Sequence, residues 1–254
     1  MKNKIKPDFL NHIIELGSVD STNDYAGELV KKSLVKEGTV IWAHLQTDGR
    51  GQGENIWESE NGMNLTFSVI LMPRFLTPER QFLLNMAISL GVLDFIRTLE
   101  IMAGFSLKWP NDIYAGKNKL GGILINNTIN GPTYTVAVVG IGLNINQIVF
   151  PKELPNPVSL KLLSGKTFPL KSCLDNLLAC LSMRYIQLRT SFEQVIKPDY
   201  KKCLLGYNEE RTYSHAGKHF PGMIRGVDEF GRLLVETKDK GILIFNHKEI
   251  EFIL

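Results

Sequence analysis

The sequence predicts an α+β protein in which a larger domain of strands and helices is followed by a small all-β module. The first 210 or so residues mix runs of apolar residues at helical spacing with runs that alternate every second residue. After Arg211 only short apolar runs separated by turn residues occur. A chain of 254 residues is long enough for a main domain with a small appendage.

The first predicted elements surround a glycine-rich loop. A helix is expected from Ser21 to about Ser33, because Ser21 can cap free amides and Asp24 lies in the first turn, where the helix dipole favours negative charge. Residues 40–45 are rich in strand formers, and the apolar side chains of Leu65–Leu71 alternate along one face. The loop therefore connects two strands.

Two further helices are predicted. The first begins with Thr77 as a cap, Pro78 at the first helical position and Glu79 in the first turn. Its expected apolar stripe consists of Phe82, Met86, Leu90 and Leu93. The second starts near Ser172, and its expected buried side chains are Leu174, Leu177, Leu178, Leu181, Tyr185 and Leu188. Short strands are expected between them, around Leu107, at 123–125 and at 134–139.

The C-terminal module is predicted from short strands with turn chemistry between them. The apolar runs are 223–224, 233–235, 242–245 and 250–254, and the turns are 228–231 and 239–241. We therefore expect two domains, at 1–208 and 209–254, packed together because no low-complexity linker separates them.

Composition favours an ordinary cytoplasmic protein. The net charge of +3 comes from 29 basic and 26 acidic residues without a basic stripe, so nucleic-acid binding gets no support. No apolar run approaches the length of a membrane span, and the basic residues 1–8 lack the apolar segment of a signal peptide. Cys173 and Cys180 are expected in the core, and the glycine and proline around His215 and His219 argue against a zinc helix.

The first chemical candidate is the loop 46–53, Gln-Thr-Asp-Gly-Arg-Gly-Gln-Gly, whose glycines allow backbone to approach a ligand closely. It lacks the P-loop pattern. Gly165-Lys166-Thr167 resembles the end of a P-loop, but the first glycine of that motif is replaced by Leu160. Taken alone, the loop is more readily explained as a flexible hairpin connection than as a binding site.

The second candidate is Lys108-Trp109-Pro110-Asn111-Asp112, followed by the segment 117–125. Pro110 disfavours a helix, so Lys108, Asn111 and Asp112 should lie at the end of one strand and Lys119 at the start of the next. Cations beside a carboxylate can anchor a polyphosphate through Mg²⁺, whereas the alternative reading is a charged hairpin tip.

The third candidate is the strand that leads into alternating glycines, 139–146, Val-Gly-Ile-Gly-Leu-Asn-Ile-Asn. Such glycines are typical of a bulge or a tightly packed strand. The asparagines after them would suit recognition of a ribose or a base, but they are equally typical of a turn.

In this order, the Ser-Thr-Asn at 21–23 and these three segments resemble the biotin protein ligase family, with its Gly-Arg-Gly, Lys-Trp-Pro-Asn-Asp, Lys-Leu-x-Gly-Ile and Gly-x-Gly-x-Asn motifs. The resemblance runs from about Ser18 to Asn146, and the terminal β module resembles the family's small SH3-like barrel. It implies a mixed-sheet catalytic domain of the biotin/lipoate ligase type, a ligase that uses ATP and Mg²⁺ to form biotinyl-5′-AMP and then biotinylates a lysine of a biotin carboxyl carrier protein.

The resemblance also implies roles for individual residues. Those expected to bind biotin are Ser21, Thr22, Asn23, Gln46, Gly49, Arg50, Lys119, Gly122, Gly140 and Gly142. Those expected to bind ATP are Gln52, Asn55, Trp57, Lys108, Asn111, Leu143 and Asn144. Arg50, Lys108 and Lys119 are expected to be catalytic, and Asp112 to hold the metal.

The chain departs from the family pattern after Gly-Arg-Gly, where Gln52 and Asn55 replace arginines. This puts retention of the adenylate by the loop in doubt.

Only 20 residues precede the Ser-Thr-Asn motif, so we expect no helix-turn-helix and no DNA binding. A monomer and a homodimer are both compatible with the sequence. The alternative functions are a lipoate ligase, which shares the fold and the chemistry, and a biotin-binding relative without turnover.

Overall fold

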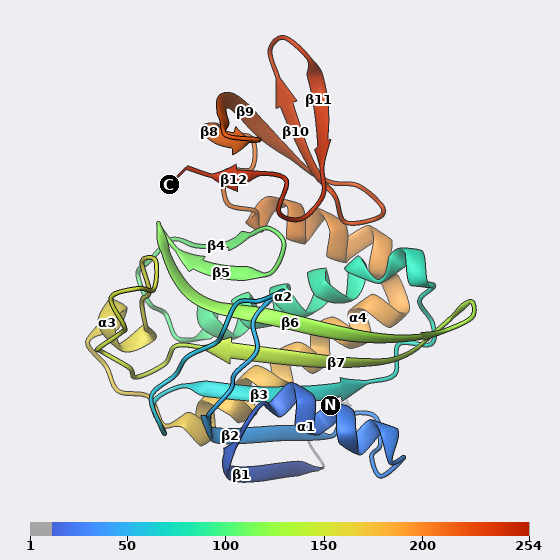
Figure 1. Ribbon diagram of the computed structural model, residues 1–254, viewed down its shortest axis with the longest axis vertical. Coiled ribbons are helices and arrows are strands. Elements are labelled where there is room, and N and C mark those ends of the chain that lie inside the picture. The colour runs from blue at the N-terminus through green and yellow to red at the C-terminus, as the bar shows by residue number, and fades with distance from the viewer. Residues whose placement is uncertain (1–11, 254) are drawn as a thin grey trace, which may run out of the picture.

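The computed structural model describes residues 12–253, so the basic residues 1–8 lie outside the described residues. In this part of the chain, seven strands form one sheet in the order β1-β2-β3-β7-β6-β5-β4 (Figure 1). Their bounds are Ile13–Val19 (β1), Val40–Gln46 (β2), Leu65–Leu71 (β3), Phe105–Lys108 (β4), Asp112–Ala115 (β5), Asn118–Asn130 (β6) and Thr133–Leu143 (β7). The β1–β2 pair is parallel and the others are antiparallel, so the predicted mixed sheet is confirmed.

Helices cover both faces of this sheet. Helices α2 (Phe82–Thr98) and α4 (Leu170–Cys203) bury the apolar side chains of one face in the main core. Helix α1 (Thr22–Lys31) lies on the other face, where Ala26 packs against Ile41, Ile70 and Val138. Because side chains alternate along a strand, Leu65, Phe67 and Val69 of β3 point to the main core, whereas Ser68 points to the face of α1.

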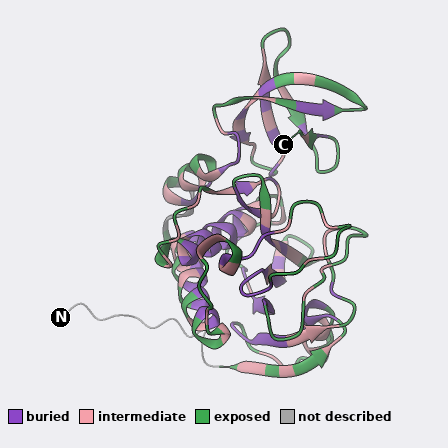
Figure 2. Cartoon of the chain, turned by 90° about the vertical axis from the view of Figure 1, so that its left-hand side faces the viewer, coloured by how far each residue is buried: buried purple, intermediate pink, exposed green. Residues whose placement is uncertain are grey.

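The predicted helices exist, with three corrections. Ser21 caps α1, accepting from the amide of Asp24 at 3.3 Å, but the helix ends at Lys31. Thr77 makes no capping bond, and a 3-10 turn (η2, Pro78–Arg80) precedes α2. Phe82 is only half-buried, and α2 is buried around most of its circumference, because α4 and the sheet cover different sides of it (Figure 2). All six side chains expected in the core of α4 are buried.

The strand predictions were partly wrong. The expected short strands at 123–125 and 134–139 lie within the longer strands β6 and β7. Strands β1 and β5 and the short helix α3 (Leu160–Ser164) were missed. Of the two cysteines expected in the core, Cys173 is buried and Cys180 half-buried.

The C-terminal module is a second sheet of five strands among the described residues, in the order β11-β10-β9-β8-β12. Their bounds are Glu210–His215 (β8), Lys218–Val227 (β9), Leu233–Thr237 (β10), Gly241–Phe245 (β11) and Glu251–Phe252 (β12). Both predicted turns are present, whereas β8 was missed. The module sits above β4 and β5 (Figure 1), where the indole of Trp109 donates to the carbonyl of Gly231 at 2.8 Å.

The helices of residues 12–253 include none that is long and apolar enough to span a membrane. The same residues contain no cluster of three or more potential metal-ligating side chains.

Candidate active site

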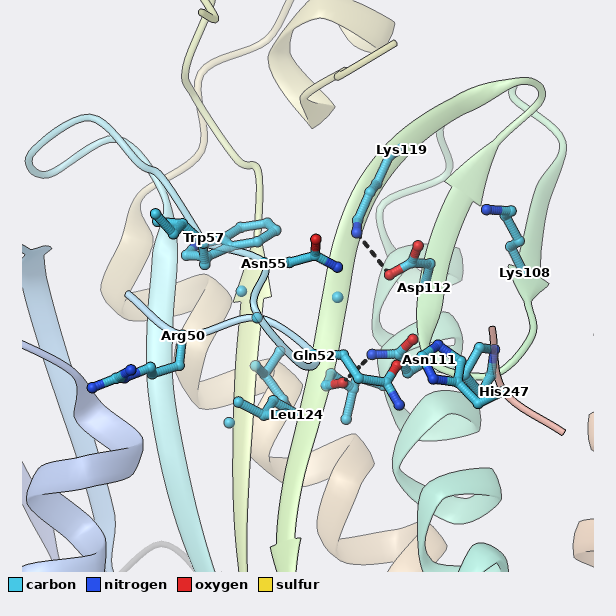
Figure 3. Close-up of a pocket in the computed structure, with 18 of the residues that line it drawn as sticks. Arg50, Gln52, Asn55, Trp57, Lys108, Asn111, Asp112, Lys119, Leu124 and His247 are labelled. Atoms are coloured by element: carbon cyan, nitrogen blue, oxygen red, sulfur yellow. Dashed lines mark hydrogen bonds and ion pairs between the residues drawn. The ribbon is translucent and has the colours of Figure 1, made fainter. Parts of the chain in front are cut away.

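A cavity of about 330 Å³ opens where the ends of β4–β7, the start of α1, the loop after β2 and the C-terminal module meet (Figure 3). Of the residues predicted to form the site, those that line it are Ser21, Thr22, Asn23, Gln46, Arg50, Gln52, Asn55, Trp57, Lys108, Asn111, Asp112, Lys119, Gly122, Gly140 and Gly142. These residues are up to 121 positions apart in sequence, so the topology of the sheet brings the separate motifs into one cavity.

The start of α1 supplies a hydrogen-bonded polar wall. The amide and hydroxyl of Thr22 donate to Oε1 of Gln46 at 2.8 and 2.9 Å. The Ser68 hydroxyl lies 2.8 Å from that of Thr22 and 2.7 Å from Oδ1 of Asn23. Asn23 in turn donates to the carbonyl of Leu124 at 3.3 Å. These buried amides and hydroxyls therefore have fixed orientations, as recognition of a polar ring requires.

Glycines of β6 and β7 make the floor of the cavity. Gly122 pairs with Gly142, and Gly140 pairs with Ser68 on one side and Leu124 on the other. A β-carbon at position 140 would lie 2.7 Å from Oδ1 of Asn23, and one at 142 would overlap the indole of Trp57. The side chains of Asn23 and Trp57 therefore pack directly on the backbone of β7 at these two glycines.

The loop 47–57 folds back on itself as a hairpin. Gly51 donates to the carbonyl of Asn55 at 2.7 Å, and Trp57 donates to that of Gly49 at 2.8 Å. Arg50 is turned aside from the cavity centre (Figure 3), toward Asp24 at 3.1 Å and Asp48 at 3.4 Å. Its hydrogen bond to Asp24 raises the pKa of Arg50 further. The arginine is therefore paired with carboxylates that an anionic ligand would have to replace.

Two polar atoms of this loop are buried without a hydrogen-bond partner among the described residues. They are Oε1 of Gln52 and Nε1 of Trp57. Because an unsatisfied buried donor or acceptor is costly, such atoms indicate a place where a ligand supplies the partner.

The opposite wall carries the lysines and Asp112. Lys119 of β6 lies 2.8 Å from the carboxylate of Asp112 in β5, and Asn111 donates to the carbonyl of Ile123 at 2.7 Å. Burial lowers the pKa of Lys108. The charge of Asp112 raises this pKa and partly offsets the effect of burial, whereas the charge of Lys119 lowers it further. Lys108 has ring partners rather than a carboxylate, at 5.4 Å from the centroids of both Tyr114 and Phe252. The wall thus holds two cations and one carboxylate within a short distance.

The C-terminal module completes the cavity, which sequence reasoning missed. His247, Lys248, Ile250, Glu251 and Phe252 all line it. The His247 ring lies 6.2 Å from that of Trp109, and burial followed by repulsion from Lys248 lowers the pKa of His247. No local pattern marks this segment, because its place depends on how the module packs. Ser68 was missed for a similar reason, since it lies inside an ordinary strand.

Three predicted residues lie outside the lining of the cavity. Gly49 is held in the hairpin by Trp57, and Leu143 is fully buried. Asn144 is buried and donates to the carbonyl of Val158 at 3.0 Å, while its amide donates to Leu120 at 2.9 Å. Asn144 therefore anchors the segment after β7, and a ligand role for these three stays a prediction.

The polar wall at one end of the cavity suits a ligand with a polar ring. The cations at the other end suit the carboxylate of that ligand and the phosphate with which it reacts. Attack of one anion on another requires fixed positive charge more than an acid or a base. The donor set also fits Mg²⁺ carried by a nucleotide, since such an ion needs one or two carboxylates besides phosphates, and Asp112 and Glu251 line the cavity.

The chain is similar in sequence to known proteins. A model of the Biotin/lipoate A/B protein ligase family matches residues 16–144. The bifunctional ligase/repressor BirA of Bacillus spizizenii is 31% identical over 90% of this chain and 70% of its own length. The biotin–[acetyl-CoA-carboxylase] ligase of Mycobacterium tuberculosis is 28% identical over 82% of this chain and 77% of its own.

The structural likeness extends over nearly the whole chain. The biotin protein ligase from Aquifex aeolicus in complex with biotin and ATP aligns with a TM-score of 0.78 at 28% identity, covering 96% of this chain and 99% of that one. The alignment therefore takes in the C-terminal module as well as the mixed sheet. The chain belongs to the biotin/lipoate A/B protein ligase family.

Proposed function

We propose that this protein is a biotin protein ligase, which activates biotin with ATP and transfers it to a lysine of a biotin carboxyl carrier protein. The observation that carries the proposal is the single cavity in which the Ser21–Asn23 wall faces Lys119 and Asp112 across a glycine floor. Relatives named as biotin ligases, and the Aquifex aeolicus structure with biotin and ATP, support the same substrates.

In the first step a carboxylate oxygen of biotin attacks the α-phosphorus of ATP. An oxygen–phosphorus bond forms, the bond to the β-phosphate breaks, and biotinyl-5′-AMP and pyrophosphate result. Lys119 and Arg50 would neutralise the charge that builds on the α-phosphate. Arg50 has to leave Asp24 and Asp48 to do so, and the negative charge of the substrates provides a competing partner.

The polar wall would hold the ureido ring of biotin. Thr22, Asn23 and Gln46 present donors and acceptors that Ser68 keeps in place. A neutral, hydrogen-bonded ring suits this wall, because it carries no unpaired charge. Gly140 and Gly142 let Asn23 and Trp57 pack directly on β7, and both side chains line the cavity and would contact the ring.

The nucleotide would lie toward β4, β5 and the C-terminal module. Lys108 and Asn111 line this side, with Gln52, Asn55 and Trp57 of the loop above it. Mg²⁺, when bound with ATP, would be held by Asp112 and would draw charge from the phosphates.

In the second step the amine of the acceptor lysine attacks the acyl carbon of the adenylate. An amide bond forms, AMP leaves, and the amine loses a proton.

We also propose the domain boundary at 208/209, just before β8. The absence of DNA binding, a cytoplasmic location and a monomeric or homodimeric state remain predictions.

The experiment is ATP–pyrophosphate exchange, measured side by side with biotin, with lipoate and without acid. We expect exchange that requires biotin and Mg²⁺. Exchange with lipoate alone would identify a lipoate ligase, whereas tight biotin binding without exchange would identify a non-catalytic relative. Transfer to a recombinant carrier domain, followed by mass spectrometry, then tests the second step.

A further inference from the structure

The cations that line the cavity differ in whether a carboxylate neutralises them. Arg50 is paired with Asp24 and Asp48, and Lys119 is paired with Asp112. Lys108 and Lys248 form no ion pair with any of the described residues. One of these two lysines comes from the main sheet and the other from the C-terminal module, so both domains contribute uncompensated positive charge.

Lys248 reaches the loop that covers the cavity. A β-carbon built on Gly53, at the loop tip, would lie 2.8 Å from the ammonium nitrogen of Lys248. The loop has neutral side chains at Gln52 and Asn55, on either side of its tip. Lys248 therefore brings a positive charge to a part of the cavity where the loop carries none.

The turn that carries Lys248 is held in place from both sides. Lys248 has a left-handed backbone, with φ of 70°. Glu249 accepts from the amide of Asn246 at 2.7 Å, and the neighbouring His247 packs against Trp109. A non-glycine residue in this conformation costs free energy, so the surrounding contacts hold the backbone of Lys248 in place.

On the proposed function, we infer that Lys248 is a substrate-binding residue for the pyrophosphate portion of ATP. The α-phosphate must reach the partly buried Lys119, where the carboxylate of biotin arrives. The β- and γ-phosphates then extend toward the opening of the cavity, where Lys248 is exposed. A lysine there binds the incoming polyphosphate as a mobile point charge and lies on the exit route of the pyrophosphate.

The test compares Lys248→Asn with wild type, because asparagine accepts the left-handed backbone while the substitution removes the charge and shortens the side chain. We expect the KM for ATP and the inhibition constant for inorganic pyrophosphate to rise about fivefold, the scale of an exposed ion pair. The kcat, the Kd for biotin and inhibition by AMP should stay the same. Lys248→Arg should restore both constants, and the differences should shrink at high salt.

Lys240→Ala is the matched control, since Lys240 lies in the exposed β10–β11 turn of the same module. It should leave every constant unchanged. Unchanged pyrophosphate inhibition in Lys248→Asn, or equal losses for AMP and pyrophosphate, would overturn the inference while leaving the proposed function intact. Absence of biotin-dependent exchange in wild type would instead remove the proposed function, and the inference with it.

Discussion

The ammonium group of Lys119 and the carboxylate of Asp112 face each other at 2.8 Å across the β5–β6 pair, each more than half buried. Asp112 can therefore serve a metal ion, orient Lys119, or do both. Gly122 pairs with Asp112 in the sheet, and a β-carbon there would lie 3.4 Å from the carboxylate and 3.9 Å from the Lys119 ammonium, so the pair packs directly over this glycine.

Asp112→Asn should separate these roles. We expect adenylation to slow about tenfold or more, equivalent to ~1.4 kcal/mol of transition-state stabilisation, with little change in biotin binding. The measurement is single-turnover formation of the adenylate at several Mg²⁺ concentrations. A rate that recovers at high Mg²⁺ supports the metal role, whereas loss at every concentration shows that Asp112 only positions Lys119.

Arg50→Ala and Lys119→Ala should differ from each other. Arg50→Ala should weaken biotin binding and slow adenylation together, because this side chain serves the loop that closes on biotin. Lys119→Ala should damage adenylation more than binding, since its charge is needed most as the phosphate charge develops. Calorimetry beside single-turnover kinetics decides the matter. Equal losses of binding and rate in Lys119→Ala would mean that Lys119 merely holds substrate.

The lowered pKa of Lys108 predicts an alkaline limb in kcat/KM for ATP. The charged lysine is lost as the pH rises through its shifted pKa, which lies below the ordinary value of 10.5, so activity should fall earlier than for an exposed lysine. Because burial disfavours the charge, Lys108 also costs folding stability at neutral pH, and this cost fades as the pH rises toward 10.5.

Two variants check the origin of this limb. Lys108→Arg should abolish it, because arginine keeps its charge throughout the range. Asp112→Asn should move it to lower pH, because Asp112 raises the pKa of Lys108. An unchanged limb in Lys108→Arg would assign the titration to another group.

Ser68→Ala should weaken biotin binding although Ser68 does not line the cavity. Its hydroxyl bonds to both Thr22 and Asn23, and removal leaves a buried acceptor of Asn23 unpaired, at a cost of about 1–3 kcal/mol. We expect about a tenfold rise in the Kd for biotin by calorimetry, with kcat nearly unchanged. Ser89→Ala is the control, since Ser89 is buried in α2, away from the cavity. If both variants behave alike, Ser68 supports only the fold.

Local signals in the sequence identified only part of the site. Ser21 caps a helix, as its neighbours predicted, whereas alternating glycines such as Gly140 and Gly142 are also typical of a bulge, and only the family resemblance pointed to them as ligand contacts. Asn144 shows the limit of such reasoning, because its side chain turns to Val158, a contact that depends on where the chain returns after β7.

The fold shows the same division. The alternation of β3 gave its bounds correctly, whereas the polar residues of β6, as in Asn126-Asn127-Thr128, hid the length of that strand. His247 and Lys248 join the site only because Trp109 fixes the C-terminal module against the sheet, and no pattern within one segment reports such packing.

The glycine floor of the cavity has a consequence for inhibitor resistance. A compound that packs against Asn23 and Trp57, the side chains seated on Gly140 and Gly142, would depend on groups that the natural substrate would also use. A substitution that adds a side chain there would meet Asn23 or Trp57 before it met the compound, so it would impair the natural substrate as well. Escape mutations should therefore arise mainly in the loop and in the C-terminal module, whose side chains also line the cavity.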